Sequence, residues 1–425
     1  MISETRMIKP KYIAALAAIV IIIAIFYHQQ EAGASEAPEK EPVEDCTPPA
    51  PTPMDSLIFT YDSLLSRRID SMGSVGAAVV VTHGNDIAYL KTFGVRKAGT
   101  KAPVNKHTLF RLASVSKTIS GVLAGILSAD SLVILEDKVI DYLPGFRLRD
   151  SLSTHTMTVQ HLLSHTSGLV PHAYDNMVEA GVPLQTILDS LFRVNISGAP
   201  GSLYGYQNVM FSLYDTLSRV KTQTPFETLL QKRVFEPFRM PDASAGYTPF
   251  AMSHNKAFPH VRYSGVYRAL PLNDRYYNTL PAAGINASIS DMAQFLLALQ
   301  DSTSMPPAVL QEVLTPRVRS PLRWIYLRKW GKVESKHYAL GWRIIGYHQR
   351  KIAYHGGYVQ GYKAEVAFCP EEKLGMAFLT NSPNGVASGT VPLLLDLYFD
   401  RFQQEETVHR PDTPSDNPTH VNPKP

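Results

Sequence analysis

Strand-forming segments lie at both ends of the chain's globular part, and helix-forming segments fill its middle. Residues 76–95 read GAAVVVTHGNDIAYLKTFGV, two strand-like runs around a Gly-Asn-Asp turn, which is typical of a hairpin. Helical periodicity dominates from residue 114 to about residue 230, and four strand-like segments follow from Tyr338. This order predicts an α+β fold. We expect one antiparallel sheet built from both chain ends and flanked by helices, with a mostly helical second lobe and a cleft between them.

The composition fits a globular protein with a large core. The 425 residues are 44% hydrophobic and 18% charged, with a formal net charge of +4. This near-neutral balance gives no indication of a nucleic-acid partner. Segments poor in apolar residues and rich in proline flank the globular part. We therefore predict a Pro/Glu-rich tether over residues 31–54, a folded domain over 55–403 and a disordered tail over 404–425.

The N-terminus carries a short apolar segment preceded by basic residues. Sixteen uncharged residues run from Tyr12 to Tyr27. This length lies between the roughly 20 residues of a spanning helix and the about 7–15 residues of a signal-peptide core. We predict that residues 1–30 are a signal anchor or, alternatively, a signal peptide cleaved near the small residues at 32–34. Both alternatives place the rest of the chain across the membrane, in the periplasm or outside the cell, because the basic residues precede the apolar run.

The chain has two cysteines. Cys46 lies in the predicted tether, and Cys369 lies near the C-terminal end of the predicted folded domain. They are able to pair in an oxidising compartment, and two separate free thiols are an equally good interpretation.

A serine and a lysine stand three positions apart where an apolar helical run begins. The segment FRLASVSKTISGVLAGIL at 110–127 contains Ser114 and Lys117. In a helix this spacing puts both side chains on one face. A hydroxyl becomes a good nucleophile when a base takes its proton, and a lysine with a depressed pKa is such a base. The alternative for Ser114 is an ordinary helix N-cap. The pattern recurs at Ser218 and Ser253, where we interpret it as chance on a polar face.

Four further segments follow this pair along the chain. They are HLLSHTSGL at 161–169, PGSLYGYQN at 200–208, LPAAGINASISDMAQFLLAL at 280–299 and YHGGYVQGY at 354–362. In this order the series resembles the serine hydrolases related to class C β-lactamases and penicillin-binding proteins. That family includes esterases, D-amino-acid peptidases and D-Ala-D-Ala carboxypeptidases. The resemblance covers roughly residues 55–402 and implies a β-lactamase/DD-peptidase-like fold.

The resemblance also implies roles for individual residues. Ser114 would be the nucleophile, Lys117 and Tyr206 would manage its proton, and Asn208 would hold the substrate and Lys117. The Tyr-x-Asn motif of Tyr206 follows a Pro-Gly lead-in. The same spacing without that lead-in occurs at Tyr174 and Tyr276.

The third motif departs from the family's usual Lys-Thr-Gly or Lys-Ser-Gly. This chain has His355-Gly356-Gly357, a replacement of the kind found in the esterase and peptidase branches. By resemblance, His355 would position the substrate, and the backbone N–H groups of Ser114 and Tyr358 would form the oxyanion hole. Glycines at this place would let the substrate approach the strand closely. A histidine with its ordinary pKa of about 6.5 would change charge below neutral pH, so we expect substrate preference to depend on pH.

These features predict an extracytoplasmic serine hydrolase that forms an acyl-enzyme on an ester or amide. Its substrate would be a small molecule or a peptide, with peptidoglycan-derived compounds among the candidates. The alternative is a catalytically idle relative that binds peptidoglycan fragments or a protein partner, and the presence of all three motifs argues against it. No cofactor is implied. His161 and His165 have the spacing of metal ligands on a helix, but no third ligand accompanies them, so we predict structural roles.

A basic segment with two tryptophans, residues 317–336, precedes the late strands. We predict a solvated loop. The alternative is a basic-aromatic face that rests on an anionic membrane surface.

Overall fold

The computed structural model describes residues 17–25, 28, 52–321, 327–331 and 333–408. They fall into two compact units, Met1–Pro51 and Thr52–Pro425. In the first unit residues 17–25 are helical, and the ends of the predicted apolar run lie outside the described residues. Within the described part of the chain, none of the helices has both the length and the apolar character needed to cross a membrane. Most of the predicted tether and residues 409–425 also lie outside the described residues.

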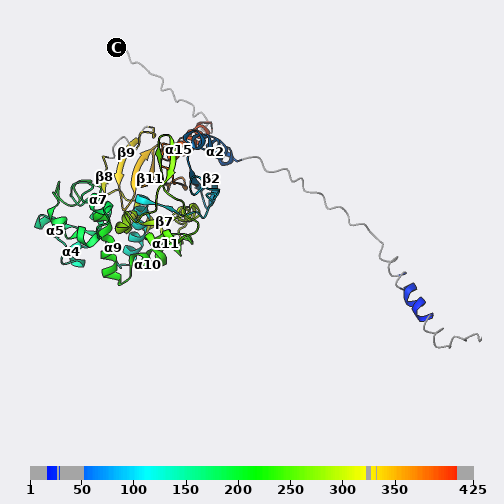
Figure 1. The fold of residues 1–425 in the computed structure, drawn as a ribbon, viewed down its shortest axis with the longest axis horizontal. Coiled ribbons are helices and arrows are strands. Elements are labelled where there is room, and N and C mark those ends of the chain that lie inside the picture. Colours follow the sequence, from blue (N-terminus) through cyan, green and yellow to red (C-terminus); the bar gives the residue numbers. More distant parts are fainter. Residues whose placement is uncertain (1–16, 26–27, 29–51, 322–326, 332, 409–425) are drawn as a thin grey trace, which may run out of the picture. The chain divides into compact units, whose positions relative to one another are not determined.

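An antiparallel sheet of eight strands forms the centre of the second unit (Figure 1), in the order β2-β1-β13-β12-β11-β10-β9-β8. The strands are β1 Gly76–His83, β2 Asp86–Gly94, β8 Val318–Arg319, β9 Val333–Tyr338, β10 Arg343–Tyr347, β11 Arg350–Val359, β12 Tyr362–Cys369 and β13 Leu374–Thr380. The predicted hairpin is β1 and β2. Strand β1 pairs on its other side with β13, with Ala77 opposite Thr380. Both chain ends therefore contribute to one sheet, as predicted.

Helices cover both faces of this sheet. Helices α2 (Pro53–Met72) and α15 (Thr390–Val408) pack together on one face, and α3 (Ser116–Ala129) and α13 (Ile289–Ala298) pack on the other. Strand β1 is buried on both faces, so its alternate side chains enter two different cores. This explains why β1 reads as a continuous apolar run rather than as an alternating one.

The middle of the chain forms a mostly helical region, as predicted (green in Figure 1). Its helices are α4 Val139–Tyr142, α5 Ser151–Thr156, α6 Val159–Leu163, α7 Asp175–Glu179, α8 Leu184–Leu188, α9 Asn208–Thr222, α10 Phe226–Leu230, α11 Tyr247–Met252, α12 Leu280–Ala283 and α14 Pro307–Leu314. A short sheet orders β3 (Phe110–Arg111), β7 (Ile285–Ala287) and β4 (Ser244–Ala245), and a separate hairpin pairs β5 (His260–Tyr263) with β6 (Val266–Ala269). The predicted α+β class is confirmed, with one antiparallel sheet from both chain ends, flanking helices and a mostly helical region.

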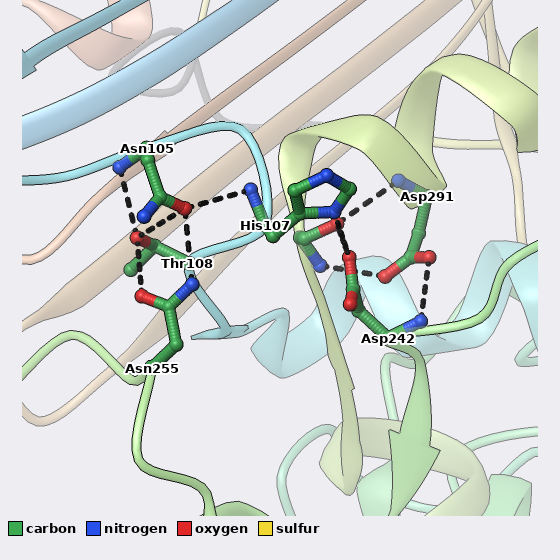
Figure 2. Close-up of polar contacts among 7 residues, drawn as sticks. Asn105, His107, Thr108, Asp242, Asn255 and Asp291 are labelled. Atoms are coloured by element: carbon green, nitrogen blue, oxygen red, sulfur yellow. Dashed lines mark hydrogen bonds and ion pairs between the residues drawn. The ribbon is translucent and has the colours of Figure 1, made fainter.

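Polar contacts fix the loop that leads into β3 (Figure 2). Thr108 Oγ1 donates to Asn255 Oδ1 at 2.9 Å, and His107 Nδ1 lies 2.8 Å from Asp242 Oδ2. The backbone N–H of Asp242 donates in turn to Asp291 Oδ1 at 3.1 Å. This network ties the chain to the start of α13 shortly before it reaches Ser114.

The structure bears on two sequence-based interpretations. Trp330 is buried against the rings of Tyr347 and Tyr354, so it is not part of an exposed basic-aromatic face. Cys369 is buried in β12, and burial raises the pKa of its thiol to about 11. Its predicted partner Cys46 lies outside the described residues.

Candidate active site

Ser114 lies on a short 3₁₀ turn, η1 (Ala113–Val115), between β3 and α3. The preceding Ala113 has a φ of +48°, a left-handed conformation that is uncommon for alanine and is held by the surrounding structure. Helix α3 begins at Ser116, and its N-cap residue Val115 makes no side-chain capping bond. The N-cap interpretation of Ser114 is therefore wrong. Its hydroxyl is partly exposed and points to another side chain.

The structure brings four of the predicted site residues together. Tyr206 Oη donates a hydrogen bond to Ser114 Oγ at 2.9 Å. Lys117 is completely buried, and its Nζ donates to Asn208 Oδ1 at 2.8 Å and to the Ala282 carbonyl at 3.0 Å. The same Nζ lies 4.7 Å from the centre of the Tyr206 ring. Ser114 and Lys117 come from the adjacent η1 and α3, whereas Tyr206 and Asn208 lie just before and at the start of α9, more than 90 residues later.

Burial sets the protonation of this group. Burial lowers the pKa of Lys117 well below its usual value, the carboxylate of Asp175 opposes this shift, and the guanidinium of Arg343 reinforces it. Burial also raises the pKa of the Tyr206 phenol. Both shifts favour the neutral amine of Lys117 and the protonated phenol of Tyr206. A neutral amine has two N–H donors, which its two acceptors use, and its lone pair remains to take a proton.

Strand β11 lies directly against η1, the turn that carries Ser114. A Cβ at Gly357 would overlap the Leu112 carbonyl oxygen and lie 3.0 Å from the Ser114 nitrogen. The glycine is thus required by contact between strand and turn, whereas we expected it to admit substrate. A Cβ at Gly356 would instead meet Glu365 and Tyr354. The following residue, Tyr358, has an exposed side chain.

His355 does not have the environment that the sequence suggested. It is completely buried, its Nδ1 lies 2.9 Å from the Gly356 carbonyl, and its Nε2 lies 3.1 Å from Tyr338 Oη. A carbonyl only accepts, so Nδ1 carries the proton and Nε2 accepts from the tyrosine. Burial, Arg343 and Lys117 hold the pKa of His355 well below its usual value. The pH-dependent substrate preference that we expected from an unperturbed histidine does not follow.

Sequence reasoning missed Arg343. It lies on β10, next to the strand of His355, and its Nη1 donates to Tyr204 Oη at 3.0 Å. Its guanidinium carbon lies 5.5 Å from the ring centres of both Tyr206 and Tyr338. In the part of the chain that the structure describes, no carboxylate is within ion-pair distance of it. The sequence pointed to Arg343 only indirectly, through its hydrogen-bond partner Tyr204, which belongs to the PGSLYGYQN segment.

Sequence reasoning also missed Asp175, the first residue of α7. Its carboxylate accepts two hydrogen bonds from Asn208 Nδ2, at 3.0 and 3.1 Å, and lies 2.7 Å from His172 Nδ1. Asp175 is the middle residue of Tyr174-Asp175-Asn176, the first Tyr-x-Asn pattern in the chain. We did not assign this pattern to the family motif, because no Pro-Gly pair precedes it.

The other candidate patterns form local contacts. Ser218 Oγ donates to the Asp215 carbonyl within α9, and Lys256 Nζ donates to the Ser253 carbonyl. His161 Nδ1 accepts from the Thr158 backbone in a helix cap, and His165 Nδ1 accepts from the Gln207 backbone. Among the described residues there is no group of three or more His, Cys, Asp or Glu side chains that could hold a metal ion.

A pocket of about 430 Å³ opens beside Tyr358. Its lining combines β5, the segment before Tyr276 and the turn after β11, and includes Arg262, Leu272, Arg275, Tyr358 and Gln360.

Comparison with known proteins places these features in a family. A beta-lactamase of Yersinia enterocolitica is 24% identical over 363 residues, covering 76% of this chain and 87% of that protein. Esterase EstB of Burkholderia gladioli is 29% identical over 221 residues, covering 48% of this chain and 56% of the esterase. The octameric penicillin-binding protein homologue from Pyrococcus abyssi has the same fold, with a TM-score of 0.69 at 21% identity over 80% of this chain and 77% of that one. The family model described as Beta-lactamase matches residues 61–397, and the chain therefore belongs to the beta-lactamase family and is a serine hydrolase.

Proposed function

We propose that this protein is an extracytoplasmic serine hydrolase in which Ser114 forms an acyl-enzyme on an ester or amide substrate. One observation carries the proposal: the hydroxyl of Ser114 is hydrogen-bonded to Tyr206, beside the buried Lys117, whose pKa is lowered well below its usual value. The extracytoplasmic location rests on the basic residues that precede the apolar N-terminal run.

In the proposed reaction Ser114 Oγ attacks the substrate's carbonyl carbon. Its proton passes to the Lys117 amine, with the Tyr206 hydroxyl as the intermediate donor and acceptor. The backbone N–H groups of Ser114 and Tyr358 stabilise the resulting oxyanion, each contributing roughly 3–4 kcal/mol. Collapse of this intermediate expels the alcohol or amine, which takes up the proton from Lys117. Water then attacks the acyl-enzyme by the same route and releases the acid.

The substrate class remains a choice among ester, amide and lactam bonds, because the relatives include a beta-lactamase and an esterase. We propose a small-molecule or peptide substrate, with peptidoglycan-derived compounds as one candidate group. Two features support an anionic or polar substrate. Arg343 places a permanent positive charge beside Tyr206, and Arg262 and Arg275 line the pocket next to Tyr358.

Labelling with a fluorophosphonate probe tests the proposal without knowledge of the substrate. We expect the parent chain to be labelled at Ser114 and Ser114→Ala to lose all labelling while keeping its melting temperature, because this hydroxyl caps no helix. Ser218→Ala, which alters the rival Ser-x-x-Lys pattern, is the matched control and should label normally. A folded parent chain that does not label would contradict the proposal and favour the idle, binding relative.

A panel of chromogenic esters, D-amino-acid amides and nitrocefin then separates the three bond types. The substrate with the highest kcat/KM defines the class, provided that Ser114→Ala abolishes its turnover.

A further inference from the structure

Hydrogen bonds lead from Lys117 through Asn208 to the carboxylate of Asp175. Asn208 Oδ1 accepts from Lys117 Nζ at 2.8 Å, and Asn208 Nδ2 donates to both oxygens of Asp175, at 3.0 and 3.1 Å. Asn208 is 6% exposed and its bond with Lys117 is buried, where a hydrogen bond is stronger, whereas the Asp175 carboxylate is partly exposed. Asp175 is thus joined to the group that would take the proton of Ser114.

The two partners of Asn208 select one orientation of its amide. A lysine N–H donates, and an ionised carboxylate only accepts. If the amide were turned over, its nitrogen would face the donors of Lys117 and its oxygen would face Asp175. The contact between the amide oxygen and the Asp175 carboxylate would then be repulsive, so Asp175 determines which end of the amide faces Lys117.

The loop that carries Asp175 is fixed to the segment that carries Tyr206. The backbone N–H of His172 donates to the Tyr206 carbonyl at 2.8 Å, and His172 Nδ1 lies 2.7 Å from Asp175 Oδ2. His172 and Tyr174 have φ values of +61° and +63°, a left-handed conformation that is uncommon for non-glycine residues. Such backbone persists only where surrounding contacts stabilise it.

We propose that Asp175 is a positioning residue, which holds the Asn208 amide oxygen toward Lys117 and keeps the Asn208 nitrogen away from the substrate. This inference rests on the proposed function, because it takes Lys117 as the acceptor of the Ser114 proton. It changes the role of Asn208, since the donor that would contact substrate by resemblance is used inside the protein.

Asp175 also acts on Lys117 through its charge. Its carboxylate opposes the lowering of the Lys117 pKa by burial. The other charged or titratable groups around Lys117 are Arg343, Tyr206, His165 and His355. Loss of the Asp175 charge lowers the Lys117 pKa further. The amine then stays neutral at lower pH, so the acidic limb of the pH–rate profile moves to lower pH.

The test is the rate constant for fluorophosphonate labelling of Ser114, measured from acidic to neutral pH. Asp175→Ala should label about tenfold more slowly at neutral pH, because a charge-assisted hydrogen bond is lost. Asp175→Asn keeps an oxygen acceptor for Asn208 and should recover most of the rate. In both variants the acidic limb should move to lower pH. The matched control is Glu179→Gln on the same helix, whose carboxylate accepts from Tyr276. It should change neither the rate nor the limb.

A double-mutant cycle with Asn208→Ala separates positioning from a merely structural role. If Asp175 acts through Asn208, Asp175→Ala should change the labelling rate in the Asn208→Ala background by less than about twofold. A further loss of about tenfold in that background would overturn the proposal. So would an unchanged rate in Asp175→Ala, or a loss that accompanies a lower melting temperature without any shift of the acidic limb. If Asp175→Ala does not fold, Asp175→Asn replaces it in the double-mutant cycle and in the pH series, and the same outcomes then support or overturn the proposal. A folded parent chain that does not label at Ser114 would instead overturn the proposed function, and this inference with it.

Discussion

At the residue scale, two opposite charges act on the buried amine of Lys117. Asp175 raises its pKa, and Arg343 lowers it, against a larger lowering by burial. Neither charge comes from the three motifs that mark the family in this sequence. Residues outside the motifs therefore adjust the pKa of the proposed general base, which burial lowers most strongly.

Arg343→Gln should move the acidic limb of the labelling profile to higher pH, opposite to the Asp175 variants. The guanidinium disfavours a protonated Lys117, so its removal raises the Lys117 pKa. A higher pKa leaves less neutral amine at a given pH. The measurement is the fluorophosphonate labelling rate across the acidic range. Arg319→Gln removes the same charge from an exposed position on the end strand β8 and should leave the limb in place. A limb that stays in place in Arg343→Gln would mean that Arg343 does not act on the base.

At the element scale, close backbone contacts hold both the Ser114 turn, η1, and the first turn of α3. Strand β11 contacts η1 at Gly357, where a side chain would overlap Leu112. The loop before β10 contacts the first turn of α3 at Gly341, where a Cβ would overlap the Lys117 carbonyl. Gly341 also has a φ of +76°, which favours glycine independently. These contacts fix Ser114 and Lys117 relative to the strand that carries the proposed oxyanion donor.

Gly357→Ala should lower kcat/KM on whichever panel substrate is turned over by about 100-fold, because the added methyl group pushes β11 away from the Ser114 turn and misplaces the oxyanion donors. Overpacking of this kind should also lower the free energy of unfolding by about 1–3 kcal/mol in a urea titration. Gly145→Ala is the matched control, since a Cβ at Gly145 meets no atom within 4 Å. Full activity in Gly357→Ala would show that the site tolerates a shift of the strand.

At the scale of the whole molecule, the sheet joins the two ends of the globular unit. The chain enters this unit at Thr52, whose side chain caps α2 in a reciprocal bond with Asp55. Helix α15, at the other end, packs on α2 and continues to Val408, past the predicted boundary at residue 404. Both ends therefore lie on the face of the sheet opposite α3, the helix that carries Lys117.

We expect the full-length chain to stay in the membrane pellet after alkaline carbonate washing. The apolar run from Tyr12 to Tyr27 would act as an uncleaved anchor, with a tyrosine at each interface. The measurement is an immunoblot of pellet and supernatant with determination of the N-terminus. A soluble product that begins near Ser35 would show instead that the run is a cleaved signal peptide.

The sequence by itself determined the fold class, because strand periodicity at both ends and helical periodicity between them allow few arrangements. It also brought out Ser114, Lys117, Tyr206 and Asn208, since the reaction needs these residue types and the motifs keep their local spacing. What it did not contain was the environment of those residues. Only the tertiary structure decided that Lys117 and His355 are buried, which lowers the pKa of both.

Only the tertiary structure also decided which other residues act on the side chains of the motifs. Asp175 and Arg343 come from α7 and β10, far from Lys117 along the chain, and no local pattern shows that either of them acts on Lys117. Gly357 was recognised from its motif. A glycine is needed there because the strand contacts the Ser114 turn, which is a packing contact between distant segments. Local patterns encode which groups are present. Charge, burial and steric contact act through space, so the state of those groups is decided only when the chain is folded.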